Sequence, residues 1–319
     1  MASRAPLGRH DLSQITAVVT GAAGFLGEAL AERLAASGAR VIATDVARGV
    51  GPGGRERIRL DVLDADALRT ALVGLLGDDA ESAVVFHLAA RGHVGACRDD
   101  PRGAVALNVV GTANVLEACR EAGVRRVVFP SSALVYKLPA RSPIGEDAPV
   151  APRSIYAATK LACEALLQAY AVEYGLSCTV ARLGNVYGRG AAADSVASSV
   201  MRQAIAGGPV VVETLAPIRD FIYRDDVLSG LMALARWSDA SGFQLVNISS
   251  GVPTSIRELA ETACAVVGVR AMPTERSSRP GAAQDSVVLS IERMTACTGW
   301  TPMFSLEAGL RATLAENGS

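Results

Sequence analysis

The sequence lacks the patterns that mark disulfide-bonded, zinc-binding and membrane-spanning proteins. Its six cysteines form no Cys-x-x-Cys pair, and its three histidines, His10, His87 and His93, are scattered. Neither a disulfide framework nor a metal site is therefore expected, and the cysteines should be buried as small apolar side chains. No apolar run reaches about 20 residues and no apolar leader precedes the first predicted strand, so we expect a soluble, cytoplasmic protein.

The sequence also lacks an excess of charge of either sign. It carries 31 lysines and arginines against 32 aspartates and glutamates in 319 residues. Binding to nucleic acid or to a membrane surface is therefore not expected. Lysine itself is scarce, because Lys137 and Lys160 are the only two among these basic residues. A lysine that persists against such a bias points to a chemical role.

The stretch from Thr16 to Gly27 joins a β-branched run to three glycines, Gly21, Gly24 and Gly27. This pattern predicts a strand, a tight turn and the start of a helix. Glycine lets a phosphate approach the backbone closely, and the unpaired N–H groups of a helix N-terminus favour an anion. Because the spacing is G-x-x-G-x-x-G, a turn that needs glycine for packing alone is the alternative.

Acidic residues lie at the ends of the next two predicted strands. A strand over 40–44 ends at Asp45, 18 residues after Gly27, where a carboxylate can accept the hydroxyl groups of an adenosine ribose. The third strand, over 57–62, carries Asp61, for which two roles stay open: accepting from an adenine amino group and capping a helix as a loop carboxylate. Together with the glycine turn, these features predict a dinucleotide-binding β-α-β unit.

Strands and helices then alternate, which predicts a doubly wound parallel α/β sheet with ligands at the carboxyl ends of its strands. The run over 83–90 is apolar on both faces, as in a central parallel strand. A helix is expected over 102–122 with Asn108 inside it, and the strand over 126–129 leads to Ser132.

A helix that begins near Ser154 carries Tyr156 and Lys160 four residues apart, so both project from one helix face. With Ser132 and the glycine turn in register, this order resembles the extended short-chain dehydrogenase/reductase family. More narrowly, it resembles the NAD-dependent epimerase/dehydratase branch that acts on nucleotide sugars. The resemblance covers about residues 15–230 and, weakly, the remainder, and it implies a Rossmann fold with a smaller C-terminal substrate lobe.

The resemblance implies that Ser132, Tyr156 and Lys160 are catalytic, with Asn108 bracing them or only capping local backbone. Hydride transfer from a sugar alcohol needs a base for the hydroxyl proton, and a free tyrosine with a pKa of about 10 is mostly neutral at pH 7. We expect Lys160 and the nicotinamide ring to lower the pKa of Tyr156. Ser132 would align the reacting oxygen. The expected cofactor contacts are Gly21, Gly24, Phe25, Leu26, Gly27, Asp45, Asp61, Val62, Leu88, Ala89, Ala90, Tyr156 and Lys160.

The expected cofactor is NAD, because Asp45 would repel the 2′-phosphate of NADP. Arg48 lies three residues further on and leaves NADP open.

The substrate-binding residues that the resemblance implies are Ser132, Asn185, Arg219 and Arg279. Asn185 would meet a nucleotide diphosphate, and the two arginines would clamp it, since a planar guanidinium suits bidentate contact with phosphate. Surface charge is the alternative for either arginine alone. The segment before Arg219 lacks the family's glycine-rich turn and Ala282 replaces an expected aspartate, so recognition of the base stays open.

The family's dehydratases carry an Asp-Glu pair directly after the catalytic hydroxyl, where this chain has Ala133 and Leu134. We therefore expect no 4,6-dehydratase. The sequence favours an NAD-dependent nucleotide-sugar 4-epimerase of the UDP-hexose type, acting through a transient 4-keto intermediate. A one-way NAD(P)H-dependent 4-keto-sugar reductase or sugar-acid dehydrogenase is the alternative, and an inactive dinucleotide sensor is a third. Motifs do not separate the first two, since they do not encode the room an intermediate needs to rotate.

Three parts of the chain are predicted. Residues 1–13 form a flexible tail. Residues 14–180 form the dinucleotide-binding domain, to which 218–240 return, and the substrate lobe comprises 181–217 and 241–319.

The predicted helix over 155–173 is apolar almost all round, with Lys160, Glu164 and Gln168 on one narrow stripe. The helix over 102–122 is similarly rich in small apolar residues. These faces predict a homodimer through a four-helix contact, with burial inside one chain as the alternative.

Overall fold

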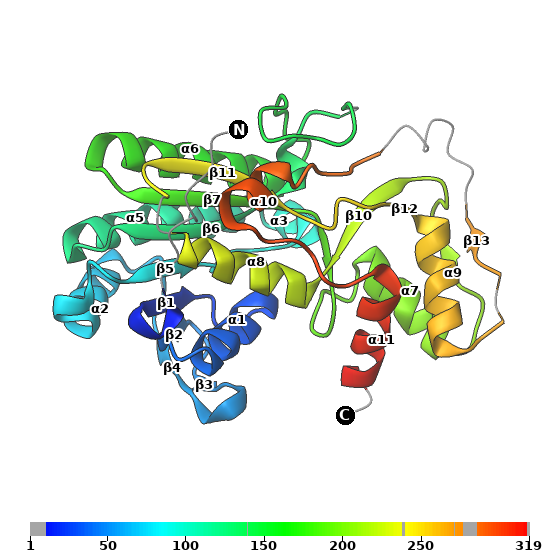
Figure 1. Cartoon of the computed structure of the whole chain (residues 1–319), viewed down its shortest axis with the longest axis horizontal. Helices are drawn as coiled ribbons and strands as arrows, with labels where there is room; N and C mark the ends of the chain where they lie inside the picture. Colours follow the sequence, from blue (N-terminus) through cyan, green and yellow to red (C-terminus); the bar gives the residue numbers. More distant parts are fainter. Residues whose placement is uncertain (1–10, 139, 238–239, 271, 277–285, 318–319) are drawn as a thin grey trace, which may run out of the picture.

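The computed structural model describes residues 11–138, 140–237, 240–270, 272–276 and 286–317 (Figure 1). The predicted tail lies mostly outside this range. Its last residues are not loose, because Leu12–Gln14 forms a 3-10 turn with Leu12 buried against the core. None of the described helices is long and apolar enough to cross a bilayer.

An eight-stranded sheet forms the centre of the molecule, in the order β11-β7-β6-β5-β1-β2-β4-β3 (Figure 1). All neighbours pair in parallel except β3 and β4. This confirms the doubly wound α/β fold. The strands are β1 (Thr16–Thr20), β2 (Arg40–Asp45), β3 (Gly49–Val50), β4 (Glu56–Arg59), β5 (Val84–His87), β6 (Arg126–Ser132), β7 (Ser177–Leu183) and β11 (Phe243–Ile248).

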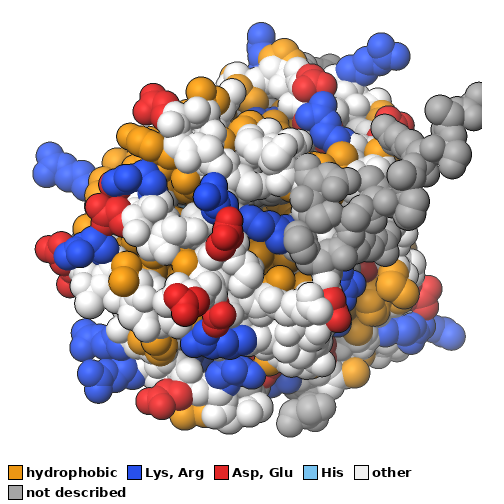
Figure 2. All heavy atoms as spheres, turned by 60° about the vertical axis from the view of Figure 1, so that its left-hand side comes forward, with side chains coloured by type: hydrophobic (Ala, Val, Ile, Leu, Met, Phe, Trp, Pro, Cys, Tyr) orange, Lys and Arg blue, Asp and Glu red, His pale blue; other side chains and the backbone are white. Residues whose placement is uncertain are grey.

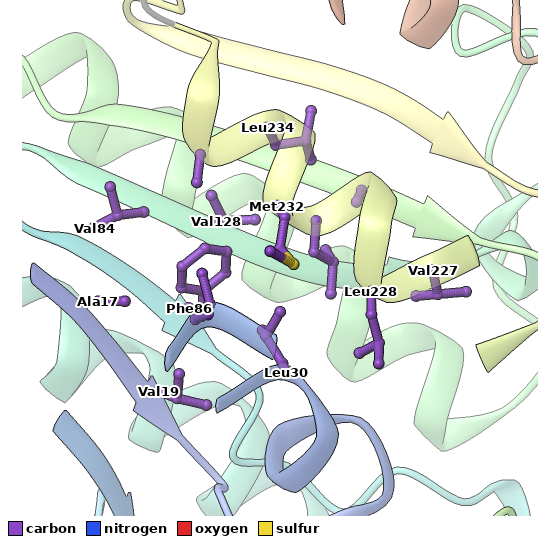
Figure 3. Packing of buried hydrophobic residues seen from close by; sticks show 14 of the residues in the cluster. Ala17, Val19, Leu30, Val84, Phe86, Val128, Val227, Leu228, Met232 and Leu234 are labelled. Atoms are coloured by element: carbon purple, nitrogen blue, oxygen red, sulfur yellow. The ribbon is translucent and has the colours of Figure 1, made fainter. Parts of the chain in front are cut away.

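Helices cover both faces of this sheet. Alternate residues of β1 enter two separate cores: Ala17 and Val19 pack on one side, and Val18 packs on the other. Figure 3 shows the first core, in which Leu30 and Leu228 from two helices meet the sheet residues. The helices of the first face are α1 (Phe25–Ala36), α8 (Arg224–Arg236) and α10 (Glu292–Thr298), and those of the second are α2 (Ala65–Leu76), α5 (Gly111–Ala122) and α6 (Ile155–Tyr174).

A smaller lobe lies beside the carboxyl ends of the central strands (Figure 1). Its core is a third apolar cluster built by three helices and short strands. The elements are a three-stranded sheet of β12 (Pro253–Ser255), β10 (Ile218–Tyr223) and β8 (Asn185–Tyr187), a pair of β13 (Thr274–Glu275) and β9 (Val211–Val212), and helices α7 (Val196–Ile205), α9 (Ile256–Val267) and α11 (Leu306–Asn317).

The predicted division between the two parts needs correction at two points. Strand β11 completes the large sheet beside β7, and α10 packs on it, although 241–319 was assigned to the lobe. Conversely, β10 belongs to the lobe sheet although 218–240 was assigned to the large domain. Sequence order cannot reveal these exchanges, because both depend on strand pairing between distant segments.

Charged side chains of both signs lie on the outer surface (Figure 2), and α6 turns part of its polar stripe toward the interior. Figure 2 shows basic and acidic side chains interspersed over one face, as the balanced composition requires. On α6 the expected polar stripe is turned inward at Lys160 and Glu164, which are both buried, whereas Gln168 is exposed. The exposed residues of this helix include Ala158, Ala165, Ala169 and Val172 beside Gln168, Glu173 and Tyr174.

Candidate functional site

A cleft of about 690 Å³ follows the carboxyl ends of β1, β5 and β6, between the large sheet and the lobe. It is the place where a doubly wound sheet binds ligands. Its described lining includes nine of the predicted cofactor contacts, namely Gly21, Gly24, Phe25, Leu26, Gly27, Leu88, Ala90, Tyr156 and Lys160.

The glycine turn brings the start of α1 up to this cleft. Gly21 has φ +69°, and a Cβ there would lie 2.6 Å from the backbone nitrogen of Ala89. A Cβ at Gly27 would collide with the carbonyl oxygen of Gly21. The alternative role of these glycines, close packing of the backbone, is therefore also required here. The same packing leaves the N-terminus of α1 open to the cleft. This backbone cradle fits a dinucleotide pyrophosphate.

The remaining predicted cofactor contacts are not part of the cleft lining. The Asp45 carboxylate accepts from the backbone nitrogens of Ala23 and Ala47, both at 2.9 Å, so it holds the glycine turn to the end of β2. The Asp61 carboxylate accepts from Leu63 N at 2.9 Å and closes a turn in the loop, whereas the cap of α2 is Asp64.

Val62 and Ala89 are also engaged by the protein's own atoms. Val62 is buried and lies against Gly111 of α5. The backbone nitrogen of Ala89 donates to Thr20 Oγ1 at 3.2 Å. Both residues therefore support the walls of the dinucleotide-binding half.

Ser132 and Tyr156 reach the cleft from two different elements. Strand β6 ends at Ser132, whose hydroxyl accepts from Leu134 N at 3.2 Å and starts a 3-10 turn. Helix α6 starts after Ser154, whose hydroxyl caps Ala157 N at 3.1 Å. This cap places Tyr156 in the first helical turn, facing the cleft.

Lys160 lies one turn further along α6, with its ammonium buried. The Nζ atom donates to the carbonyl oxygen of Pro130 at 2.8 Å and lies 4.4 Å from the centre of the Phe129 ring. Burial lowers the pKa of Lys160 to about 8. The group is therefore still charged at neutral pH.

The chain's own residues raise the pKa of Tyr156, and the part of the expected lowering that was assigned to the nicotinamide ring stays a prediction. Burial raises the pKa of Tyr156 to about 12, and a hydrogen bond with Ser132 opposes that rise only in part. The Lys160 ammonium is directed to Pro130 rather than to the phenol oxygen. Desolvation of the phenolate is therefore the largest influence on the pKa of Tyr156.

Asn108 interrupts the expected helix over 102–122. The structure divides that region into α4 (Pro101–Val105), a π-helical turn at Ala106–Val110 and α5. The Asn108 side chain accepts from Arg91 N at 2.7 Å and donates to Thr159 Oγ1 at 2.9 Å. A single π turn often marks a functional site. Here it ties the loop after β5 to the residue that precedes Lys160, so Asn108 braces the site without lining the cleft.

The lobe supplies Asn185 and Arg219 to the opposite wall. Strands β8 and β10 pair in parallel, with Asn185 opposite Phe221. The Asn185 amide donates to the carbonyl of Asp220 at 3.3 Å, and Arg219 donates to the carbonyl of Ile218 at 2.9 Å. Both residues line the cleft, as predicted. Arg279 and Ala282 lie outside the described residues.

Two features of the site escaped the sequence analysis. His93 Nδ1 and Asp194 Oδ1 lie 3.5 Å apart, and both residues line the cleft. Beneath it, Glu164 and Arg182 form a buried ion pair. The sequence carried a signal for the second, since Glu164 is four residues from Lys160 on the same helix. Among the described residues, no group of three histidine, cysteine or acidic side chains could hold a metal ion.

Comparisons with known proteins agree with this geometry. Residues 17–249 match the model of the NAD dependent epimerase/dehydratase family. The chain is 34% identical over 309 residues to a UDP-glucose 4-epimerase of Mycolicibacterium smegmatis, covering 93% of this chain and 96% of that one. It is 30% identical over 308 residues to a GDP-6-deoxy-D-mannose reductase of Pseudomonas aeruginosa, covering 93% and 95%.

A solved structure extends the agreement to the whole fold. MoeE5 in complex with UDP-glucuronic acid and NAD superposes with a TM-score of 0.83 at 32% identity, covering 95% of this chain and 99% of that one. The match includes both the large sheet and the lobe. The chain therefore belongs to the NAD dependent epimerase/dehydratase family, within the extended short-chain dehydrogenase/reductases.

Proposed function

We propose that the protein is an NAD-dependent 4-epimerase of UDP-hexoses. The observation that carries the proposal is the convergence of Ser132 and Tyr156 with the glycine turn at one cleft. A relative with 34% identity is named as a UDP-glucose 4-epimerase. The residues after Ser132, Ala133 and Leu134, offer no acid-base pair for the elimination of water.

The chain's own residues account for the binding of NAD. The turn from Gly21 to Gly27 and the N-terminus of α1 would hold the pyrophosphate, and Lys160 would bond the nicotinamide ribose. Asp45, which lies at the end of β2, favours NAD over NADP through charge repulsion of a 2′-phosphate. Bound NAD would accept a hydride from the sugar C4 and return it to the opposite face.

Tyr156 would move the proton. Its phenolate would take the proton of the C4 hydroxyl, and the resulting phenol would later give it back, while Ser132 would hold the reacting oxygen. Because burial sets the pKa of Tyr156 at about 12, the phenolate requires a nearby positive charge during the reaction. Lys160 is the charged group on the same helix face, which explains why lysine is present here in a chain that otherwise uses arginine.

The charges in the cleft favour a neutral hexose over a uronic acid. Of the described cleft-lining residues, Lys160, Asp194 and Arg219 carry full charges, and His93 faces Asp194. Lys160 is assigned to the cofactor and Arg219 to the diphosphate of the substrate. The Asp194 carboxylate would repel a sugar carboxylate by like-charge interaction.

Incubation with UDP-galactose and, separately, UDP-glucose, without added cofactor, tests the proposal. We expect conversion of each sugar into the other, with the equilibrium reached from both sides. The reductase alternative is supported by the 30% identity to a GDP-6-deoxy-D-mannose reductase. A strict requirement for added NADH or NADPH, with consumption of a 4-keto sugar and no C4 inversion, would establish that alternative instead.

We further propose a homodimer in which α6 packs on a second copy of itself. Ala158, Ala165, Ala169 and Val172 are exposed at helical spacing along α6, and Val172 has 78% of its surface accessible. This stripe of small side chains allows close helix contact. In sedimentation velocity runs we expect a dimer that Val172→Arg dissociates, whereas a monomeric wild-type protein would exclude it.

A cytoplasmic location is part of the same proposal. All six cysteines are free and five of them are buried. Free thiols suit a reducing compartment.

A further inference from the structure

Helix α6 buries two ionisable side chains one turn apart. Lys160 is 5% exposed and Glu164 is 4% exposed. A buried charge is tolerated only when it is paired and hydrogen-bonded, because removal from water is costly. The partners of these two side chains therefore show what the pair does.

Glu164 is held from two neighbouring strands. Arg182 of β7 donates to it twice, with Nη2 to Oε2 at 2.6 Å and Nε to Oε1 at 3.0 Å. Ser131 of β6 donates its hydroxyl to Oε1 at 2.5 Å. The carboxylate thus fixes α6 to both strands in one orientation.

Lys160 binds Pro130, the residue that precedes Ser131 in β6. Its ammonium donates to the carbonyl of Pro130 at 2.8 Å. Two consecutive residues of β6 are therefore held by two side chains of α6, and Ser132 follows directly in the strand. The same pair of contacts sets the distance between Ser132 and the helix that carries Tyr156.

We propose that Glu164 is a positioning residue, whose carboxylate is the counter-charge that keeps Lys160 protonated while it anchors the strand end that presents Ser132. The assignment deepens the proposed function, on which the role of Ser132 rests. The electrostatic part rests on the one-turn spacing of Lys160 and Glu164 on α6 and on the burial of both side chains.

The groups that face Lys160 single out Glu164. Besides Glu164 they are Cys97 of α3 (Val94–Asp99), Cys163 of α6 and His87 of β5. Burial raises the pKa of the Cys97 and Cys163 thiols and lowers the pKa of His87 to about 3.

These three groups are therefore uncharged at pH 7. Glu164 is the facing group whose negative charge opposes the effect of burial on the pKa of Lys160. Arg182 lies on the same carboxylate and weakens its attraction for the ammonium.

Lysine NMR can test the assignment directly, because the chain has only two lysines. Protein labelled with ε-¹³C lysine is titrated without substrate, and Lys137→Arg assigns the remaining signal to Lys160. With Glu164→Gln we expect the pKa of Lys160 to fall by about one pH unit. With Arg182→Met it should rise, since the full charge of Glu164 then acts on the ammonium.

The opposite signs separate the proposal from a merely structural role. Loosening of α6 would shift the pKa of Lys160 toward its ordinary value in both variants. Glu173→Gln, which removes an exposed carboxylate near the C-terminal end of α6, is the matched control and should leave the titration unchanged. No change in Glu164→Gln, or a rise, would overturn the assignment.

The double replacement Glu164→Gln with Arg182→Met guards against misfolding of the single variants, because it leaves no unpaired buried charge. We expect the pKa of Lys160 to fall in it as well, by less than in Glu164→Gln. An unchanged value there overturns the proposal even if neither single variant folds.

Turnover supplies a second readout. In Glu164→Gln the alkaline limb of the kcat profile should move to lower pH together with the pKa of Lys160. If the protein converts no UDP-hexose at all, the proposed function fails while the NMR result still decides the role of Glu164.

Discussion

The two walls of the cleft are built in different ways. The sheet wall places Ser132, Tyr156 and Lys160 at the end of β6 and the start of α6, where one buried ion pair, the Ser154 cap and the bond from Lys160 to Pro130 hold the strand and the helix together. The lobe wall places Asn185 and Arg219 on a three-stranded sheet of short strands. The difference suggests a division of labour, in which the sheet wall performs the chemistry and the lobe wall selects the substrate.

The largest effect is expected from a substitution in the sheet wall that removes the proton-transferring group. Tyr156→Phe removes the hydroxyl that moves the proton, and we expect kcat for UDP-galactose to fall by about a thousandfold. Binding of NADH and the thermal midpoint should change little. Tyr174→Phe, at an exposed position of the same helix, is the control. Retention of more than a tenth of the activity in Tyr156→Phe would refute the role of this phenol.

A second prediction concerns how much the buried charge of Lys160 lowers the free energy of unfolding. Burial lowers the pKa of Lys160 from 10.5 to about 8, so below pH 8 the folded protein carries a charge disfavoured by about 3 kcal/mol. The unfolded chain binds the extra proton between pH 8 and 10.5, so this contribution makes the protein more stable as pH rises through that window.

Lys160→Met should therefore raise the free energy of unfolding in urea by about 3 kcal/mol at pH 7, although it abolishes turnover. The gain should shrink toward pH 10.5. The exposed Lys137→Met is the control. A Lys160→Met protein less stable than wild type at pH 7 would show that the contacts to Pro130 and Phe129 outweigh desolvation.

A third prediction concerns the lobe wall's own support. The buried Asp220 carboxylate accepts from the backbone nitrogens of Ser250, Gly251 and Leu289 at 2.9–3.1 Å. We expect Asp220→Ala to lower the free energy of unfolding by about 2 kcal/mol, because buried donors lose their partner. Asp66→Ala at a solvent-exposed site should have no measurable effect. Equal stabilities for the two variants would contradict this account.

The smallest expected effect tests substrate selection. Arg219→Gln should raise KM for UDP-hexoses about tenfold and leave kcat within about twofold, because a group that binds the diphosphate does so equally in ground and transition states. Arg311→Gln, in an exposed pair with Glu307, is the control. A drop in kcat with unchanged KM would show that Arg219 acts in the chemical step rather than in substrate binding.

The sheet wall could be predicted from the sequence because its signals are local. The glycine turn, the Asp64 cap of α2 and the Ser154 cap of α6 each lie within a few residues of the element they define. The alternation of strands and helices then limits the topology to a parallel sheet. Helical spacing places Tyr156 and Lys160 on one face of α6, and the resemblance to the family supplies their expected role.

The rest depended on contacts between distant segments. Membership of β11 in the large sheet and of β10 in the lobe is decided by pairing partners more than 30 residues away. The inward face of Glu164 is decided by Arg182 on another element. The raised pKa of Tyr156 results from the burial of the whole site. No local pattern encodes these features, although spacing from Lys160 pointed to Glu164.

The placement of β11 has a consequence for synthesis on the ribosome. The edge beside β7 stays unpaired, and the apolar face beneath α8 stays uncovered, until residues far beyond the nucleotide-binding motifs have emerged. A nascent chain that stops at 180 would also lack Arg182, leaving Glu164 as an unmatched anion in apolar surroundings. The two halves are thus one cooperative folding unit, and a truncated gene for the nucleotide-binding half alone should yield aggregating protein.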